Sequence, residues 1–144
     1  MSVIKLPFKD YKAIYSKVPR LCVDLVIKDS TGLLLTLRDI EPRKGFWHLP
    51  GGTVLYGESL ESAVERIAKE ELGIDVNIQK FLGSIEFLNN PKIAEHAVSL
   101  VYLVKPVTKD IMLNHQASKF DFFKLLPKNT VAEHKNFLLA SCLL

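Results

Sequence analysis

One amphipathic helix, predicted over Ser59 to Leu72, constrains the fold of this chain more than any other feature. Its apolar residues recur at the spacing of one helical face, and Gly73 follows as a plausible helix stop. On a wheel of about 100° per residue, Glu71 falls near the middle of that apolar face. An ionised carboxylate is costly to bury alone, so we expect a cation, a basic partner or a raised pKa at Glu71.

A second glutamate, Glu70, lies on an adjoining face of the predicted helix. Both glutamates fall in the last turn, where the helix dipole disfavours negative charge. Mg2+ is the natural counter-ion, with Mn2+ as the alternative, because it takes oxygen ligands and leaves room for water and substrate phosphate. Arg66, one turn before Glu70, is spaced to pair with these carboxylates. The alternative interpretation is that Glu70 and Glu71 are the solvated end of a surface helix.

The residues before the helix weigh against that alternative. Pro50-Gly51-Gly52 predicts a sharp turn, and Gly51 can bring its carbonyl close to a cation because it has no side chain. Glu58 supplies a third carboxylate at the start of the same helix. The sequence therefore predicts a magnesium site formed by a glycine loop and one end of a helix.

The rest of the chain predicts strands before and after this helix. Leu21 to Ile27 and Leu33 to Leu37 are predicted as a hairpin joined through residues 28 to 32. Further strands are predicted at Phe46 to Leu49, Val76 to Phe87, Ala97 to Val104 and Phe120 to Phe123, with a turn at Asn89-Asn90-Pro91 and helices at Lys9 to Ser16 and Thr130 to Cys142. This order favours an α+β sandwich over an alternating βαβ protein.

Composition excludes several classes of protein. At 144 residues, 48% of them hydrophobic, the chain fits one globular domain spanning residues 1–144. The net charge of +3 comes with scattered lysines, so nucleic-acid binding is not indicated. Cys22 and Cys142 are too few for a disulfide scaffold and are expected to be reduced thiols. No apolar segment is long enough to span a bilayer, so we expect no membrane partner and a cytoplasmic protein.

The residues from 51 to 74 resemble the Nudix signature. That signature asks for Gly, five residues, Glu, seven residues, then Arg-Glu-apolar-any-Glu-Glu-any-Gly-apolar. The matching residues here are Gly52, Glu58, Arg66, Ala68, Glu70, Glu71, Gly73 and Ile74, preceded by Gly45-Phe46-Trp47-His48-Leu49-Pro50-Gly51. The resemblance implies a Nudix-type α/β/α sandwich with a mixed β-sheet. It also implies that Gly51 and Glu71 bind Mg2+, that Glu70 is a further ligand, and that Arg66 orients the carboxylates.

Ile67 departs from the signature, because it replaces a glutamate that binds a second metal or activates water in many family members. The GDP-mannose mannosyl hydrolases also carry an apolar residue there, and the chain is similar to that branch over most of its length. The similarity implies sugar or diphosphate contacts at Asp24 and Arg38, a histidine of the same branch at His96, and a metal-binding glutamine at Gln116. Ala117 stands where that branch has its general-base histidine.

Together with this resemblance, the observations predict a Mg2+-dependent hydrolase of a nucleoside-diphosphate compound, with a nucleotide sugar such as GDP-mannose as the expected substrate. Two alternatives stay open: a pyrophosphohydrolase of ADP-ribose or nucleoside triphosphates, and a catalytically weak module that binds a nucleotide. The apolar C-terminal helix, which includes Phe137 and Leu138, is most simply core packing, and a homodimer contact is the sharper alternative.

Overall fold

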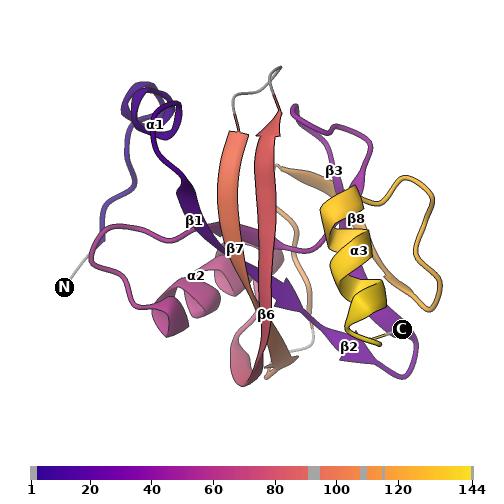
Figure 1. Cartoon of the computed structure of the whole chain (residues 1–144). Helices are drawn as coiled ribbons and strands as arrows, with labels where there is room; N and C mark the ends of the chain where they lie inside the picture. The colour runs from indigo at the N-terminus through magenta and orange to yellow at the C-terminus, as the bar shows by residue number, and fades with distance from the viewer. Residues whose placement is uncertain (1–2, 91–94, 108–109, 115, 144) are drawn as a thin grey trace.

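Two four-stranded sheets form the centre of the computed structural model, which describes residues 3–90, 95–107, 110–114 and 116–143 (Figure 1). In the first sheet the order is β5 (Gly51–Thr53), β1 (Arg20–Val26), β7 (Glu95–Pro106) and β6 (Val76–Asn90). β1 and β7 run parallel, whereas β5 pairs antiparallel with β1 and β6 antiparallel with β7. The predicted mixed sheet is therefore confirmed.

The second sheet is built around β3 (Gly32–Arg38). It pairs antiparallel with β2 (Lys28–Asp29), β4 (Trp47–His48) and β8 (Ala117–Phe123). The hairpin predicted from 21–27 to 33–37 is wrong in its pairing, because only Lys28 and Asp29 pair with β3 as a strand while β1 belongs to the first sheet. The last five residues of β1 are all buried, which requires a central position between two neighbouring strands.

Helices cover the two faces of these sheets, as Figure 1 shows for α2 (Leu60–Leu72) and α3 (Ala132–Ala140). The apolar residues of α2 pack against Val23, Leu25 and Leu34. On the other face, Leu138 of α3 packs in a second cluster with Val26 and Leu35. Alternate residues of the same strands thus point to different helices, and the predicted α/β/α sandwich is confirmed.

Helix α2 is capped at both ends. Ser59 is the N-cap and its hydroxyl accepts a hydrogen bond from the Ser62 backbone N–H at 3.1 Å. Gly73 ends the helix with a φ of 67°, a left-handed conformation that glycine adopts at little cost. The predicted Thr130 to Cys142 helix is shorter at both ends, and α1 (Phe8–Tyr15) has no buried residue.

The turn predicted at Pro50-Gly51-Gly52 is a strand in the structure. Gly51 pairs with Asp24 and Gly52 with Val23, so β5 lies directly against β1. A Cβ at Gly51 would collide with the Asp24 carboxylate and the Val23 carbonyl. Glycine is therefore needed here so that strand β5 can lie close to strand β1, and not to form a bend.

Of the turn predicted at Asn89-Asn90-Pro91, Asn89 and Asn90 belong to strand β6, and residues 91–94 lie outside the described residues. Among the helices of the described part of the chain, none is long and apolar enough to cross a bilayer.

Candidate active site

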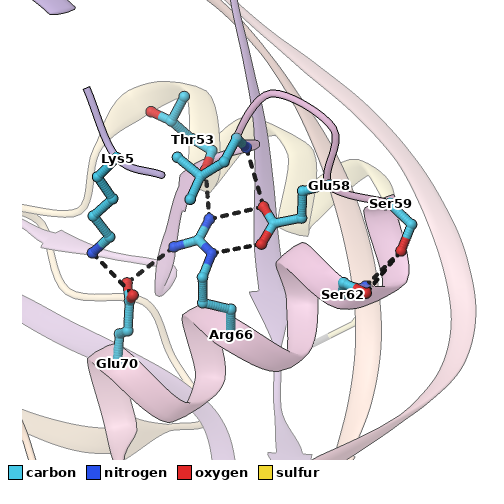
Figure 2. A network of polar contacts seen from close by, with 8 residues as sticks. Lys5, Thr53, Glu58, Ser59, Ser62, Arg66 and Glu70 are labelled. Atoms are coloured by element: carbon cyan, nitrogen blue, oxygen red, sulfur yellow. Dashed lines mark hydrogen bonds and ion pairs between the residues drawn. The ribbon is translucent and has the colours of Figure 1, made fainter. Parts of the chain in front are cut away.

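The guanidinium of Arg66 gathers the carboxylates at the exposed edge of α2 (Figure 2). Its Nε and Nη2 donate to the two Glu58 oxygens at 2.7 and 3.1 Å, and its Nη1 donates to Glu70 Oε2 at 3.0 Å. The same Nη2 also donates to the Thr53 carbonyl at 2.8 Å, which joins the helix to β5. Arg66 therefore fixes Glu58 and Glu70 relative to the glycine strand.

Glu58 is the most buried of these carboxylates, with 3% of its side chain exposed. Burial alone would raise its pKa, but hydrogen bonds from Arg66 and from the Leu55 N–H outweigh burial, and the pKa is lowered. Glu58 is therefore ionised at neutral pH and acts as the anchor of Arg66.

Glu71 lies in a different environment one residue after Glu70. Its side chain makes no hydrogen bond or ion pair with any residue that the structure describes. Burial raises the pKa of Glu71 to about 7, although the guanidinium of Arg38 pulls it in the opposite direction. A partly buried carboxylate without a bonded partner at the end of a helix favours a positive ligand, as the helical wheel predicted.

A cation of the chain itself already lies beside these carboxylates. The Lys5 ammonium is 2.9 Å from Glu70 Oε1, and its charge also favours the ionised forms of Glu58 and Glu71 (Figure 2). One positive group thus interacts with all three glutamates. A divalent cation bound here would compete with Lys5 for these oxygens and, with its double charge, would be attracted to them more strongly.

The geometry also limits the kind of cation. Within the described ranges, no three aspartate, glutamate, histidine or cysteine side chains come close enough together to hold an ion by themselves. A cation here would need backbone carbonyls, water or substrate oxygens to complete its shell, which is typical of Mg2+. Gly51 in β5 is the predicted carbonyl ligand, and α2 and β5 are in contact.

Arg38 is the last residue of β3. Its Nε donates to the Pro42 carbonyl at 2.6 Å, which leaves the two terminal nitrogens for other partners. Burial lowers the pKa of Arg38, and the charge of Glu71 opposes this shift, so the two groups are within electrostatic range. A guanidinium beside a carboxylate cluster is well placed to bind a phosphate that a metal also binds.

The predicted metal ligand Gln116 lies next to Arg38. Its carbonyl accepts a hydrogen bond from the Asp39 N–H at 2.9 Å, and the following residue, Ala117, pairs with Arg38. The fold therefore brings the backbones of Gln116 and Arg38 together. The side chain of Gln116 makes no hydrogen bond within the described part of the chain.

Asp24 lies in the middle of β1. It is 6% exposed, and its Oδ2 accepts a hydrogen bond from Nε2 of His134 in α3 at 3.0 Å. The Nδ1 of His134 in turn accepts from the Leu49 N–H at 3.1 Å, which fixes the proton on Nε2. Asp24 is thus held by His134 beside Gly51, and it is not free to contact a ligand through Oδ2.

His96 and Ile67 have contrasting positions. His96 lies exposed on β7, directly after Glu95, and it is not part of the carboxylate cluster. Ile67 is 2% exposed and packs in the α2 core, where its side chain lies against Gly52. The position that carries a glutamate in the signature is therefore a core position here, and it supplies no ligand.

Sequence reasoning missed three participants in this site. Lys5, Thr53 and His134 reach it from the N-terminal segment, from β5 and from α3. Lys5 is 65 positions away from Glu70 and His134 is 110 positions away from Asp24, and no local pattern in the sequence signals such distant pairs.

Comparisons with known proteins agree with this geometry. The family model for the NUDIX domain matches residues 18–140. The chain is 42% identical over 99 residues to the low-salt glycan biosynthesis protein Agl8 of Haloferax volcanii, and the match covers 69% of this chain and 64% of that protein. It is 34% identical over 113 residues to an ADP-ribose pyrophosphatase of Methanocaldococcus jannaschii, covering 76% and 66%. The chain thus spans less than two thirds of the length of each relative.

A solved structure supports the same relationship. The crystal structure of a MutT NUDIX hydrolase from Burkholderia pseudomallei superposes with a TM-score of 0.78 at 28% sequence identity. The superposition covers 85% of this chain and 98% of that chain.

Proposed function

The chain belongs to the Nudix family, and from this premise we propose that it is a Mg2+-dependent hydrolase of a nucleoside-diphosphate compound. A nucleotide sugar such as GDP-mannose is the proposed substrate class. The observation that carries the proposal is the arrangement around α2: Glu71 has no bonded partner among the described residues, Glu70 is held by Arg66, and Arg38 lies within electrostatic range of Glu71.

Each residue has a defined task in this proposal. When bound, Mg2+ supplies charge neutralisation for the departing phosphate. Glu71, Glu70 and the Gly51 carbonyl hold the ion, with Gln116 as the ligand from the other sheet. Arg66 is a positioning residue, because it fixes Glu70 through a 3.0 Å hydrogen bond and is itself fixed by Glu58. Arg38 binds a diphosphate oxygen through its free terminal nitrogens.

Three features support a sugar substrate. Ile67 removes the glutamate that activates water in many pyrophosphohydrolases, and its buried position leaves no polar group in its place. The relative from Haloferax volcanii is named for glycan biosynthesis. Gln116, which matches the metal-binding glutamine of the branch that attacks the anomeric carbon, lies beside Arg38. We therefore propose attack of water at that carbon, with release of the whole nucleoside diphosphate.

A second candidate function is hydrolysis of ADP-ribose or of nucleoside triphosphates by attack at phosphorus. It is favoured by the 34% identity to an ADP-ribose pyrophosphatase. A binding module without turnover is the third candidate, because both Ile67 and Ala117 replace groups that act on water elsewhere in the family.

Phosphorus NMR separates these candidates. Purified protein is incubated with GDP-mannose, other nucleotide sugars and ADP-ribose, with Mg2+ and with chelator, beside a Glu71→Gln variant. The proposal predicts nucleoside diphosphate as product, no reaction in chelator and no reaction of the variant. Nucleoside monophosphate would establish attack at phosphorus. Binding of these nucleotides without any turnover would support the third candidate.

A further inference from the structure

The N-terminal segment, residues 3–19, packs weakly against the rest of the molecule. None of its residues is buried, and its apolar side chains remain in solvent, with Ile4 81% and Phe8 76% exposed. Figure 1 shows its helix α1 standing apart from the two sheets and from α2. A segment that buries so little apolar surface can move away from its neighbours at a low cost in free energy.

One ion pair holds the first residues of this segment against α2. The ammonium of Lys5 lies 2.9 Å from Glu70 Oε1 (Figure 2). Residues 3–6 make no other hydrogen bond or ion pair within the described part of the chain. Further along, α1 is placed beside β1, because the Arg20 guanidinium lies over the Tyr11 ring at 5.8 Å from the ring centre. Lys5 is therefore the contact that brings residues 3–6 to the carboxylates of α2.

This contact takes up an oxygen of a proposed metal ligand. Glu70 Oε2 accepts a hydrogen bond from Arg66 at 3.0 Å, and Oε1 faces Lys5 (Figure 2). Each oxygen of Glu70 thus already has a positive partner. A divalent ion bound at Oε1 would lie within a few ångströms of the Lys5 ammonium, and like charges so close together repel each other. Binding of the ion at Glu70 therefore favours departure of one of the two partners.

Arg66 is the fixed partner and Lys5 is the one that can leave. The Arg66 side chain is 19% exposed and also donates to both Glu58 oxygens and to the Thr53 carbonyl. The Lys5 side chain is 63% exposed and has the single partner Glu70 among the described residues. Its departure breaks one partly exposed ion pair and uncovers no buried residue, so it costs little in free energy.

We propose that the N-terminal segment is an autoinhibitory device, in which Lys5 occupies the place of the divalent cation at Glu70 and is displaced from α2 when the ion binds. The inference rests on the proposed function, because it takes Glu70 as a metal ligand. It has two consequences: Lys5 weakens binding of the ion, and the ion releases residues 3–6. An ordinary surface ion pair would instead persist in the presence of the ion.

The first measurement is the dissociation constant of Mn2+ alone, followed by the electron paramagnetic resonance signal of the free ion. Lys9→Gln is the matched control, because it removes the same charge from an exposed lysine of the same segment that has no ion pair among the described residues. We expect Lys5→Gln to lower Kd about three- to fivefold, the effect of removing one competing ion pair. Lys9→Gln should stay within about 1.5-fold of wild type, and so should Lys5→Arg, which keeps the ion pair.

The second measurement follows the segment itself. The heteronuclear NOE of the Lys5 and Leu6 amides reports their motion on the picosecond to nanosecond timescale. We expect saturating Mg2+ to lower this NOE in wild type to the value that Lys5→Gln shows without the ion. Thermal melting in chelator checks that every variant is folded, which we expect because Lys5 and Lys9 are exposed.

Two results would overturn the inference and leave the metal site intact. One is a Kd for Lys5→Gln that equals that of wild type or of Lys9→Gln, which would mean that Lys5 does not compete with the ion through its contact with Glu70. The other is an NOE at Lys5 and Leu6 that does not change when Mg2+ saturates the wild-type protein. If neither wild type nor Lys5→Gln binds Mn2+, the proposed metal site is wrong and the inference fails with it.

Discussion

Replacing Glu71 by glutamine is predicted to stabilise the metal-free protein while it abolishes metal binding. Burial raises the pKa of Glu71 from 4.5 to about 7. Because the pKa of Glu71 is higher in the folded protein than in the unfolded chain, binding of a proton favours the folded state. This contribution to stability is present below the unfolded-state pKa and is lost as the pH rises through the folded-state pKa. At pH 8 the ionised carboxylate therefore costs the folded state about 3 kcal/mol, at 1.36 kcal/mol for each pKa unit. A neutral glutamine avoids this cost.

The assay is thermal unfolding of wild type and Glu71→Gln in chelator at pH 8 and at pH 5. We expect the variant to melt about 5 to 10 °C higher at pH 8. At pH 5 the advantage shrinks to about 1 kcal/mol, because folded wild type is then protonated at Glu71. Excess Mg2+ should raise the melting temperature of wild type and leave that of the variant unchanged.

Glu65→Gln is the matched control, because Glu65 is an exposed residue of the same helix. It should change neither the melting temperature in chelator nor the response to Mg2+. A Glu71→Gln protein that is less stable than wild type in chelator at pH 8 would refute the reasoning, since it would mean that the buried carboxylate already has a good partner.

Three further predictions concern the supporting structure. Arg66→Ala should lower the free energy of unfolding by about 2 kcal/mol and weaken Mg2+ binding, because Glu58 loses its charged hydrogen bonds. Urea unfolding measures the first effect and calorimetric titration with Mg2+ the second. Ser59→Ala should cost about 1 kcal/mol through loss of the N-cap, whereas Ser59→Gly should cost a few tenths, as seen in thermal melts. Burial lowers the pKa of His48 to about 4, and the neighbouring His134 acts in the same direction. Neutral His48 favours the folded state fully above pH 6.5, and this contribution is lost as the pH falls toward 4, which lowers the free energy of unfolding by about 3 kcal/mol. His48→Gln should remove this part of the acid sensitivity, as measured by urea unfolding.

The local elements of the fold were predictable because their signals lie within a few residues. The apolar spacing of α2 and its Gly73 stop appear in the structure as the sequence predicts. The pairing of strands was less predictable, since β1 joins β7, which lies about 75 residues later, and not the adjacent β3. Pairing of strands so far apart in the sequence depends on how both faces of the sheet pack against the helices, and no local sequence pattern contains that information.

The same division holds for the site. The motif residues Glu58, Arg66 and Glu70 form one cluster in the structure. Arg66 and Glu70 meet because they are one helical turn apart, and Glu58 meets Arg66 because the segment after β5 leads directly into the helix. The role of Asp24 could not be read from its own neighbours, because its hydrogen bond comes from His134 in the last helix.

The central claim is that the end of α2 and the strand Gly51–Thr53 hold a divalent cation. It is tested most directly by NMR of isotope-labelled protein titrated with substoichiometric Mn2+, whose unpaired electrons broaden nearby amide signals. We predict that the signals of Gly51, Glu70 and Glu71 broaden first, that excess Mg2+ restores them, and that Glu71→Gln abolishes the effect. Broadening that begins elsewhere in the chain, or that persists in Glu71→Gln, would contradict this assignment.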